Sequence, residues 1–141
     1  YRKAIDAYYL NAETGIHDLK LLEELKKVSH RNFTTGFYFD KPNEESQNYD
    51  TSSYIREYDF LGLVLSYDEQ TGMATVEQRN KINIGDTVEI FGPYTDHFTQ
   101  TIECMLDEND EPIEAAPHAQ QIIKIKTTNP ISRNFMIRKK V

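Results

Sequence analysis

The feature that most constrains the fold of this chain is a series of short strand-like segments that fills residues 60–141. Residues 60–67 form an apolar run, and residues 73–79 and 87–91 alternate between apolar and polar side chains. Gly, Pro or clusters of acidic residues separate the segments, as expected for turns between strands. Further segments of the same kind are residues 98–106, 121–126 and 135–138. Short strands with no helix between them predict an all-β barrel or sandwich.

Two corners favour a closed barrel. Residues 82–90 read apolar-x-apolar-Gly-Asp-x-apolar-x-apolar, and residues 131–138 repeat this outline with Asn134 in the place of Gly85. Gly and Asn adopt a positive φ more easily than other residues, so both sites predict a sharp turn into a strand. A Gly-Asp corner of this kind is common in small barrels such as the second domain of translation elongation factors. We therefore predict a mainly β chain with a small closed barrel at residues 57–141.

The first part of the chain has a helical pattern instead. Apolar side chains recur at helical spacing in two stretches: Ala4, Ile5, Tyr8 and Tyr9, then Leu21, Leu22, Leu25 and Val28. Two such short helices bury too little to fold alone, so we expect them to pack on something else. Residues 40–56 are rich in Asn, Ser and Glu and predict a linker. We expect residues 1–39 to be the end of an upstream domain, because the chain opens in a helical pattern without an initiator Met and reads as a fragment.

Composition excludes several classes of protein. With 16 Lys and Arg against 23 Asp and Glu, the net charge is −7. This charge opposes any sequence-independent binding of nucleic acid or anionic lipid, both of which need a cationic face. No apolar run approaches the roughly 18 residues of a transmembrane helix. One cysteine, Cys104, cannot form an internal disulfide or a Cys-rich metal site. We expect a cytoplasmic protein without a membrane partner.

The sequence contains no motif for autonomous catalysis. It has no Gly-x-Ser-x-Gly, His-Glu-x-x-His, P-loop or Gly-x-Gly-x-x-Gly pattern. Cys104 lies within a predicted strand, where a half-buried apolar role is favoured over a nucleophile. Residues 107–114 hold five carboxylates but lack the spacing of a calcium loop, so they predict a solvated hairpin turn. The four histidines are isolated in the sequence: His17, His30, His97 and His118. We therefore predict no catalytic residue, no metal site and no cofactor on this chain.

Two clusters of polar and aromatic residues remain as candidates for binding. Residues 29–39 place His30 and Arg31 beside four aromatic residues, and residues 77–81 end a strand with polar groups only. One interpretation is structural: a helix C-terminus that favours His and Arg, followed by an aromatic segment packed on a neighbouring domain. The other is a surface facing a ligand or RNA, where Arg contacts anions and aromatic rings stack on bases. The residues alone leave both open.

At these clusters the chain resembles the C-terminal part of peptidase family U32, the collagenase-like proteins. The matching motifs are SHRxFTTGFY at 29–38, FLGLVLxYD at 60–68, ATVEQRNK at 74–81, GDxVEIFGP at 85–93 and PHxQQI at 117–122. The resemblance implies an upstream catalytic domain that is absent from this chain, with the barrel as an accessory domain. Catalytic residues would lie upstream, so none is carried over. At the last corner the chain departs from the family's usual Gly-Asp, with Asn134 and Phe135 in its place.

The resemblance implies one main function and leaves two alternatives. The main interpretation is a non-catalytic lid or substrate-guiding domain of a collagenase-like peptidase, whose hydrolase activity would belong to the parent protein. The alternatives are an RNA-facing domain of a protein for wobble-uridine hydroxylation of tRNA, and a structural or dimerising module. Expected partners are the upstream domain, a peptide, protein or tRNA substrate, and a second copy of the chain. The predicted substrate-binding residues are His30, Arg31, Phe33, Arg79 and His118.

Overall fold

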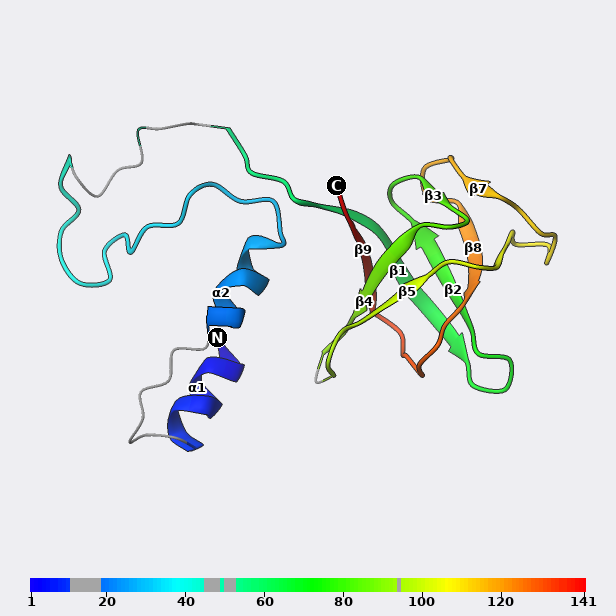
Figure 1. Cartoon of the computed structure of the whole chain (residues 1–141), viewed down its shortest axis with the longest axis horizontal. Helices are drawn as coiled ribbons and strands as arrows, with labels where there is room; N and C mark the ends of the chain where they lie inside the picture. Colours follow the sequence, from blue (N-terminus) through cyan, green and yellow to red (C-terminus); the bar gives the residue numbers. More distant parts are fainter. Residues whose placement is uncertain (11–18, 45–48, 50–52, 94) are drawn as a thin grey trace. The chain divides into compact units, whose positions relative to one another are not determined.

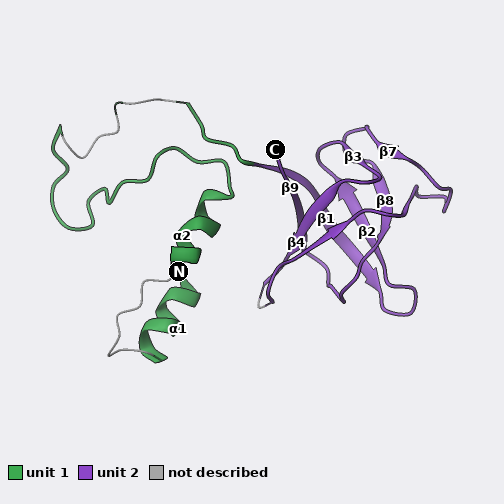
Figure 2. Cartoon of the chain, in the orientation of Figure 1, with its two compact units in different colours: residues 1–57 green, residues 58–141 purple. Residues whose placement is uncertain are grey.

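In a computed structural model, the chain divides into two units, residues 1–57 and residues 58–141 (Figures 1 and 2). The structure describes residues 1–10, 19–44, 49, 53–93 and 95–141. Parts of the predicted linker, residues 45–48 and 50–52, therefore lie outside the described residues.

Unit 1 contains two short helices, α1 (Arg2–Leu10) and α2 (Leu19–Lys26). Each helix has an ion pair between residues about one turn apart. In α1, Arg2 pairs with Asp6 at 3.0 Å. In α2, Glu24 pairs at 3.0 Å with Lys27, which directly follows the helix. Neither helix has a buried residue, and none of the other described residues of unit 1 is buried. The apolar stripes of the two helices form no core of their own in the described part of this unit.

Unit 2 is a β structure built on one curled sheet. Its long elements are β1 (Tyr58–Asp68), β2 (Met73–Gln78), β4 (Thr87–Phe91), β5 (Phe98–Thr101), β8 (Ile122–Lys126) and β9 (Met136–Lys140). With β6 (Met105–Leu106) they form a seven-stranded antiparallel sheet in the order β5-β4-β9-β1-β2-β8-β6. A second, two-stranded sheet pairs β3 (Ile82–Asn83) with β7 (Ala115–Ala116). The prediction of a mainly β fold preceded by two short helices is confirmed.

The two edges of the large sheet are consecutive parts of one chain segment. β5 pairs with β4 at one edge, and β6 pairs with β8 at the other. Three residues separate the end of β5 from the start of β6. Between them, the Ile102 N–H donates to the Asp86 carbonyl (2.9 Å), and the Gly85 N–H donates to the Ile102 carbonyl (2.8 Å). The single strand predicted over residues 98–106 is therefore bent into two, and the bend brings the ends of the sheet together as a barrel requires.

This bend also corrects the expectation for Cys104. We predicted a half-buried position within a strand, but Cys104 lies between β5 and β6 and is exposed. The side chain faces solvent because the chain leaves the ladder here, so the alternation of inward and outward residues is interrupted. Ile102 and Met105, on either side of it, are the residues that enter the core.

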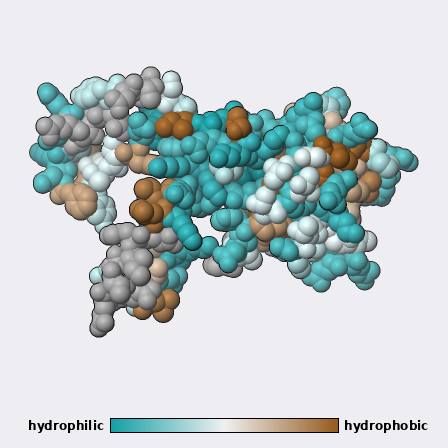
Figure 3. Space-filling view, viewed as in Figure 1, coloured by the Kyte–Doolittle hydropathy of each residue, from teal (hydrophilic) through white to brown (hydrophobic). Residues whose placement is uncertain are grey.

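The core of unit 2 consists of inward-facing residues from most of its strands. β2 shows the pattern clearly, because its exposed fraction alternates along the strand and Ala74 and Val76 are fully buried. The buried apolar residues are Leu61, Val64, Ala74, Val76, Ile82, Val88, Ile90, Ile102, Met105, Ala116, Ile123, Ile125, Ile131, Phe135 and Ile137. All belong to unit 2. Hydrophilic residues cover most of the barrel face that Figure 3 shows.

Both predicted corners have a positive φ, as the sequence indicated. Gly85 has a φ of 86° and Asn134 a φ of 71°. The residue after Asn134 is Phe135, which is 4% exposed and fills the core where the other corner has a polar Asp. The Phe135 ring lies so close to Gly92 that a Cβ there would come within 2.4 Å of it. The departure at this corner thus exchanges a polar turn residue for an aromatic core residue.

Candidate nucleic-acid interface

Three of the predicted substrate-binding residues lie together in unit 1, just after α2. They are His30, Arg31 and Phe33. The backbone of His30 pairs with that of Ile55. The His30 N–H donates to the Ile55 carbonyl (3.1 Å), and the Ile55 N–H donates to the His30 carbonyl (2.7 Å). This isolated bridge brings residues 30–33 next to residues 54 and 55, which are more than twenty positions away in the sequence.

The rings of His30 and Phe33 stack in parallel. Their centroids are 4.7 Å apart and their planes differ by 4°. The Nδ1 atom of His30 lies 2.8 Å from the Val28 carbonyl oxygen. Because a carbonyl can only accept a hydrogen bond, Nδ1 is the donor in this contact. Phe33 remains 50% exposed although one face of its ring is covered.

Arg31 lies against an aromatic residue that the sequence analysis did not select. Its guanidinium carbon is 4.9 Å from the centroid of the Tyr54 ring, within the range of a cation–π contact. Within the part of the chain that the structure describes, Arg31 has no carboxylate partner. Tyr54 is 65% exposed. The cation is thus held in place by a ring that does not neutralise its charge.

In the barrel, Arg79 directly follows β2. Its N–H donates to the Leu61 carbonyl (2.7 Å), which fixes the backbone at this end of the strand. The guanidinium pairs with Glu77 at 2.6 Å. Because this carboxylate neutralises Arg79, its side chain is a weaker anion-binding group than that of Arg31.

His118 lies at the same end of the barrel, in the loop between β7 and β8. Its N–H donates to the side-chain oxygen of Gln121 (3.3 Å), and its ring is exposed. The Gln78 N–H donates to the Gln121 carbonyl (2.9 Å), and the Gln120 N–H donates to the Gln78 carbonyl (3.1 Å). These bonds place the loop of His118 beside the end of β2. The five predicted residues therefore form two groups, one in each unit.

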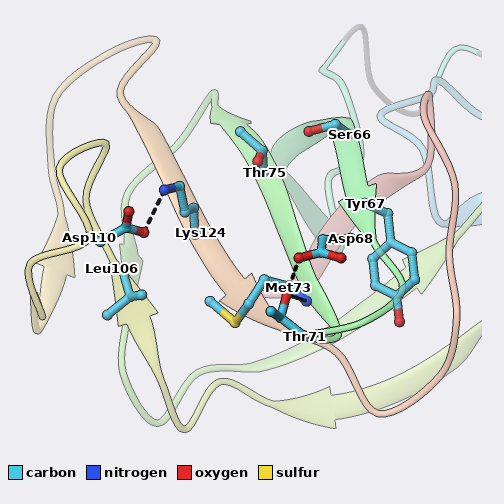
Figure 4. A pocket seen from close by; sticks show the side chains of 9 residues that line it. All are labelled: Ser66, Tyr67, Asp68, Thr71, Met73, Thr75, Leu106, Asp110 and Lys124. Atoms are coloured by element: carbon cyan, nitrogen blue, oxygen red, sulfur yellow. Dashed lines mark hydrogen bonds and ion pairs between the residues drawn. The ribbon is translucent and has the colours of Figure 1, made fainter.

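A separate pocket of about 480 Å³ lies on the barrel and involves none of the five predicted residues (Figure 4). Its charged groups are already engaged: Lys124 pairs with Asp110 at 2.5 Å, and Asp68 accepts from the Thr71 hydroxyl at 2.7 Å. That hydroxyl and the Gln70 N–H hold the pKa of Asp68 below its ordinary value. The carboxylate is thus committed to the hairpin turn. The lining residues are Ser66, Tyr67, Asp68, Thr71, Met73, Thr75, Leu106, Asp110 and Lys124.

Among the described residues, no three His, Cys, Asp or Glu side chains come close enough together to hold a metal ion. The acidic turn is organised by its own backbone instead: the Asp107 carboxylate accepts from the N–H groups of Glu111 (3.0 Å) and Asn109 (2.8 Å). Both hydrogen bonds lower the pKa of Asp107, and the one from the Glu111 N–H has the larger effect.

None of the helices in the described ranges is both long and apolar enough to cross a membrane.

Comparison with known proteins identifies the family. Residues 56–138 match the peptidase family U32 C-terminal domain, and residues 1–48 match peptidase family U32. The chain belongs to peptidase family U32. The crystal structure of the C-terminal domain of a Geobacillus thermoleovorans protein described as a U32 peptidase superimposes with a TM-score of 0.57 and 48% identity. That match covers 59% of this U32 chain and 93% of the crystallised one.

Several curated relatives match this U32 chain over nearly its whole length. The tRNA hydroxylation protein P1 of Bacillus subtilis is 43% identical over 139 residues, covering 99% of this chain and 33% of the relative. The tRNA hydroxylation protein P of Haemophilus influenzae is 31% identical over 139 residues, covering 97% of this chain and 29% of the relative. A collagenase of Porphyromonas gingivalis is 28% identical over 127 residues, covering 86% of this chain and 34% of the relative. The chain thus spans about a third of the length of these relatives.

Proposed function

We propose that the protein containing this chain takes part in hydroxylation of tRNA, and that the chain forms part of its RNA-facing surface. The observation that carries this proposal is the 43% identity to tRNA hydroxylation protein P1 of Bacillus subtilis across 99% of the chain. Identity to the Porphyromonas gingivalis collagenase is 28% across 86%. The main interpretation from the sequence was an accessory domain of a peptidase. The comparison instead favours the alternative, an RNA-facing domain of a protein for tRNA hydroxylation.

The described residues support a binding role in such a protein. Arg31 offers a cation without a carboxylate partner, and Phe33 and Tyr54 present exposed rings beside it. Guanidinium groups and exposed aromatic rings are what proteins use to hold phosphates and unpaired bases. In this proposal the chemistry of hydroxylation lies in the remaining two thirds of the protein, and this chain positions a cytoplasmic tRNA for it.

Deletion of the full-length gene tests the proposed function. We expect hydroxylated wobble uridine to disappear from bulk tRNA, as measured by mass spectrometry of digested nucleosides. The full-length gene should restore it, while a gene lacking residues 58–141 should not. A matched strain that carries the gene with Tyr9→Leu, a change at an exposed position of α1, serves as the control for complementation. Unchanged tRNA in the deletion strain would contradict the proposal and direct attention to cleavage of gelatin and peptides.

A further inference from the structure

The charge of the segment that follows α2 differs from that of the whole chain. Residues 25–39 contain Lys26, Lys27 and Arg31 but no Asp or Glu, although the chain as a whole carries a net charge of −7. Lys27 is neutralised by Glu24 at 3.0 Å. Lys26 in the last turn of α2 and Arg31 then remain as cations of a locally positive segment. A local patch of this sign attracts an anionic ligand even on an acidic protein.

The same segment presents aromatic rings to solvent. Phe33 is half exposed, with its ring stacked on His30, and the Tyr54 ring lies under the Arg31 guanidinium. An exposed ring face next to a guanidinium matches one nucleotide unit, in which a flat base is joined to a phosphate through a ribose. Because a base within a duplex is already stacked on both faces, such a ring selects unpaired bases.

We propose that His30, Arg31, Phe33 and Tyr54 form a binding site for an unpaired nucleotide of RNA. The base stacks on the exposed face of Phe33, whose opposite face is supported by the His30 ring. Arg31 contacts the phosphate, and Tyr54 acts as a positioning residue because it holds the guanidinium through its ring. This inference rests on the proposed function for its choice of RNA as the ligand, and it adds the place of contact and the single-stranded state.

Binding of short RNAs to the full-length protein tests the site. The probes are fluorescein-labelled decauridylate and a fully paired RNA hairpin, and the readout is fluorescence anisotropy at several salt concentrations. Phe33→Leu should weaken decauridylate binding by about tenfold, the size expected for the loss of one base–aromatic stack. Arg31→Gln should weaken it as well and reduce the slope of log K against log salt by about 0.7, as expected when one phosphate contact to a single strand is lost.

Phe39→Leu is the matched control, because it makes the same substitution at an aromatic residue that is 77% exposed and outside the site. It should leave decauridylate affinity unchanged. The proposed site is wrong if Phe33→Leu and Arg31→Gln both bind decauridylate like the wild type, or if the hairpin binds as tightly as decauridylate. If thermal unfolding shows that one variant does not fold, the proposed site is tested by the other variant and by the comparison of decauridylate with the hairpin.

The two proposals fail in different ways. If gene deletion removes hydroxylated uridine while the Phe33 and Arg31 variants bind RNA normally, the nucleotide site is wrong and the proposed function stands. If both variants lose decauridylate binding while the deletion leaves tRNA unchanged, the nucleotide site stands and the role in tRNA hydroxylation is wrong. If the full-length protein binds neither probe and the deletion leaves tRNA unchanged, both are wrong.

Discussion

At the scale of single residues, one side-chain amide takes the place of backbone pairing where the barrel closes. Gln100 on β5 is 7% exposed. Its Nε2 donates to the Lys126 carbonyl at the end of β8 (2.8 Å), and its Oε1 accepts from the Thr128 N–H (2.9 Å). Both hydrogen bonds are partly buried. A single side chain thus joins β5 to the strand across the gap.

We therefore expect Gln100→Leu to destabilise the barrel, although leucine has a similar size and greater hydrophobicity. The substitution removes two partly buried hydrogen bonds to the backbone, which should lower the free energy of unfolding by about 1–3 kcal/mol. Urea unfolding followed by circular dichroism measures this change. Gln70→Leu, in the exposed hairpin turn, is the control and should shift stability by less than about 0.5 kcal/mol. Equal effects of the two substitutions would show that the amide bridge contributes nothing.

At the scale of elements, one carboxylate ties the turn between β3 and β4 to β9, the strand that pairs with β4. Asp86 accepts from the Asn83 N–H (2.9 Å) within the turn and pairs with Lys139 on β9 (2.6 Å). Burial raises the pKa of Asp86, but the Lys139 ammonium and the Asn83 N–H stabilise the charged form more strongly. The net result is a lowered pKa in the folded protein. The Gly-Asp corner therefore combines a positive φ at Gly85 with an anchoring carboxylate.

A lowered folded-state pKa predicts how stability at this corner depends on pH. The ionised carboxylate stabilises the fold above the unfolded-state pKa of about 3.9, and this stability is lost as the pH falls through the folded-state value. Asp86→Asn should thus lower the melting temperature at pH 7, and its difference from the wild type should shrink below about pH 4. Glu108→Gln, in the exposed acidic turn, should show no such trend. A difference that stayed constant from pH 7 to pH 3 would contradict this account.

The elements also show what the sequence could reveal and what it could not. Strands of five or more residues, such as β2, were predicted because alternation over that length is visible. The two-residue strands β3 and β7 were missed because so short a segment has no period. In the candidate site, His30, Arg31 and Phe33 were selected as neighbours in one motif. Tyr54 was not, because only the backbone bridge between His30 and Ile55 brings it near Arg31.

At the scale of the whole molecule, the two units differ in how far they can support their own fold. Every residue of the barrel core lies between Leu61 and Ile137. The strands that pair around this core run from Tyr58 to Lys140, so they also belong to unit 2. The described residues of unit 1 contribute nothing to that core. Likewise, a C-terminal domain of a Geobacillus thermoleovorans relative was crystallised, and 93% of that chain matches 59% of this one.

We therefore expect residues 58–141, expressed alone, to fold into the barrel. An 84-residue chain with a continuous apolar core should unfold in one cooperative transition, and its amide resonances should be well dispersed in a proton–nitrogen correlation spectrum. Residues 1–57 expressed alone, which lack a buried core in their described part, are the matched comparison and should give neither signal. Poorly dispersed resonances from residues 58–141 would mean that the barrel needs the preceding residues to fold. The proposed RNA site lies in unit 1, which the isolated barrel lacks. The isolated barrel should therefore not bind decauridylate more tightly than the paired hairpin.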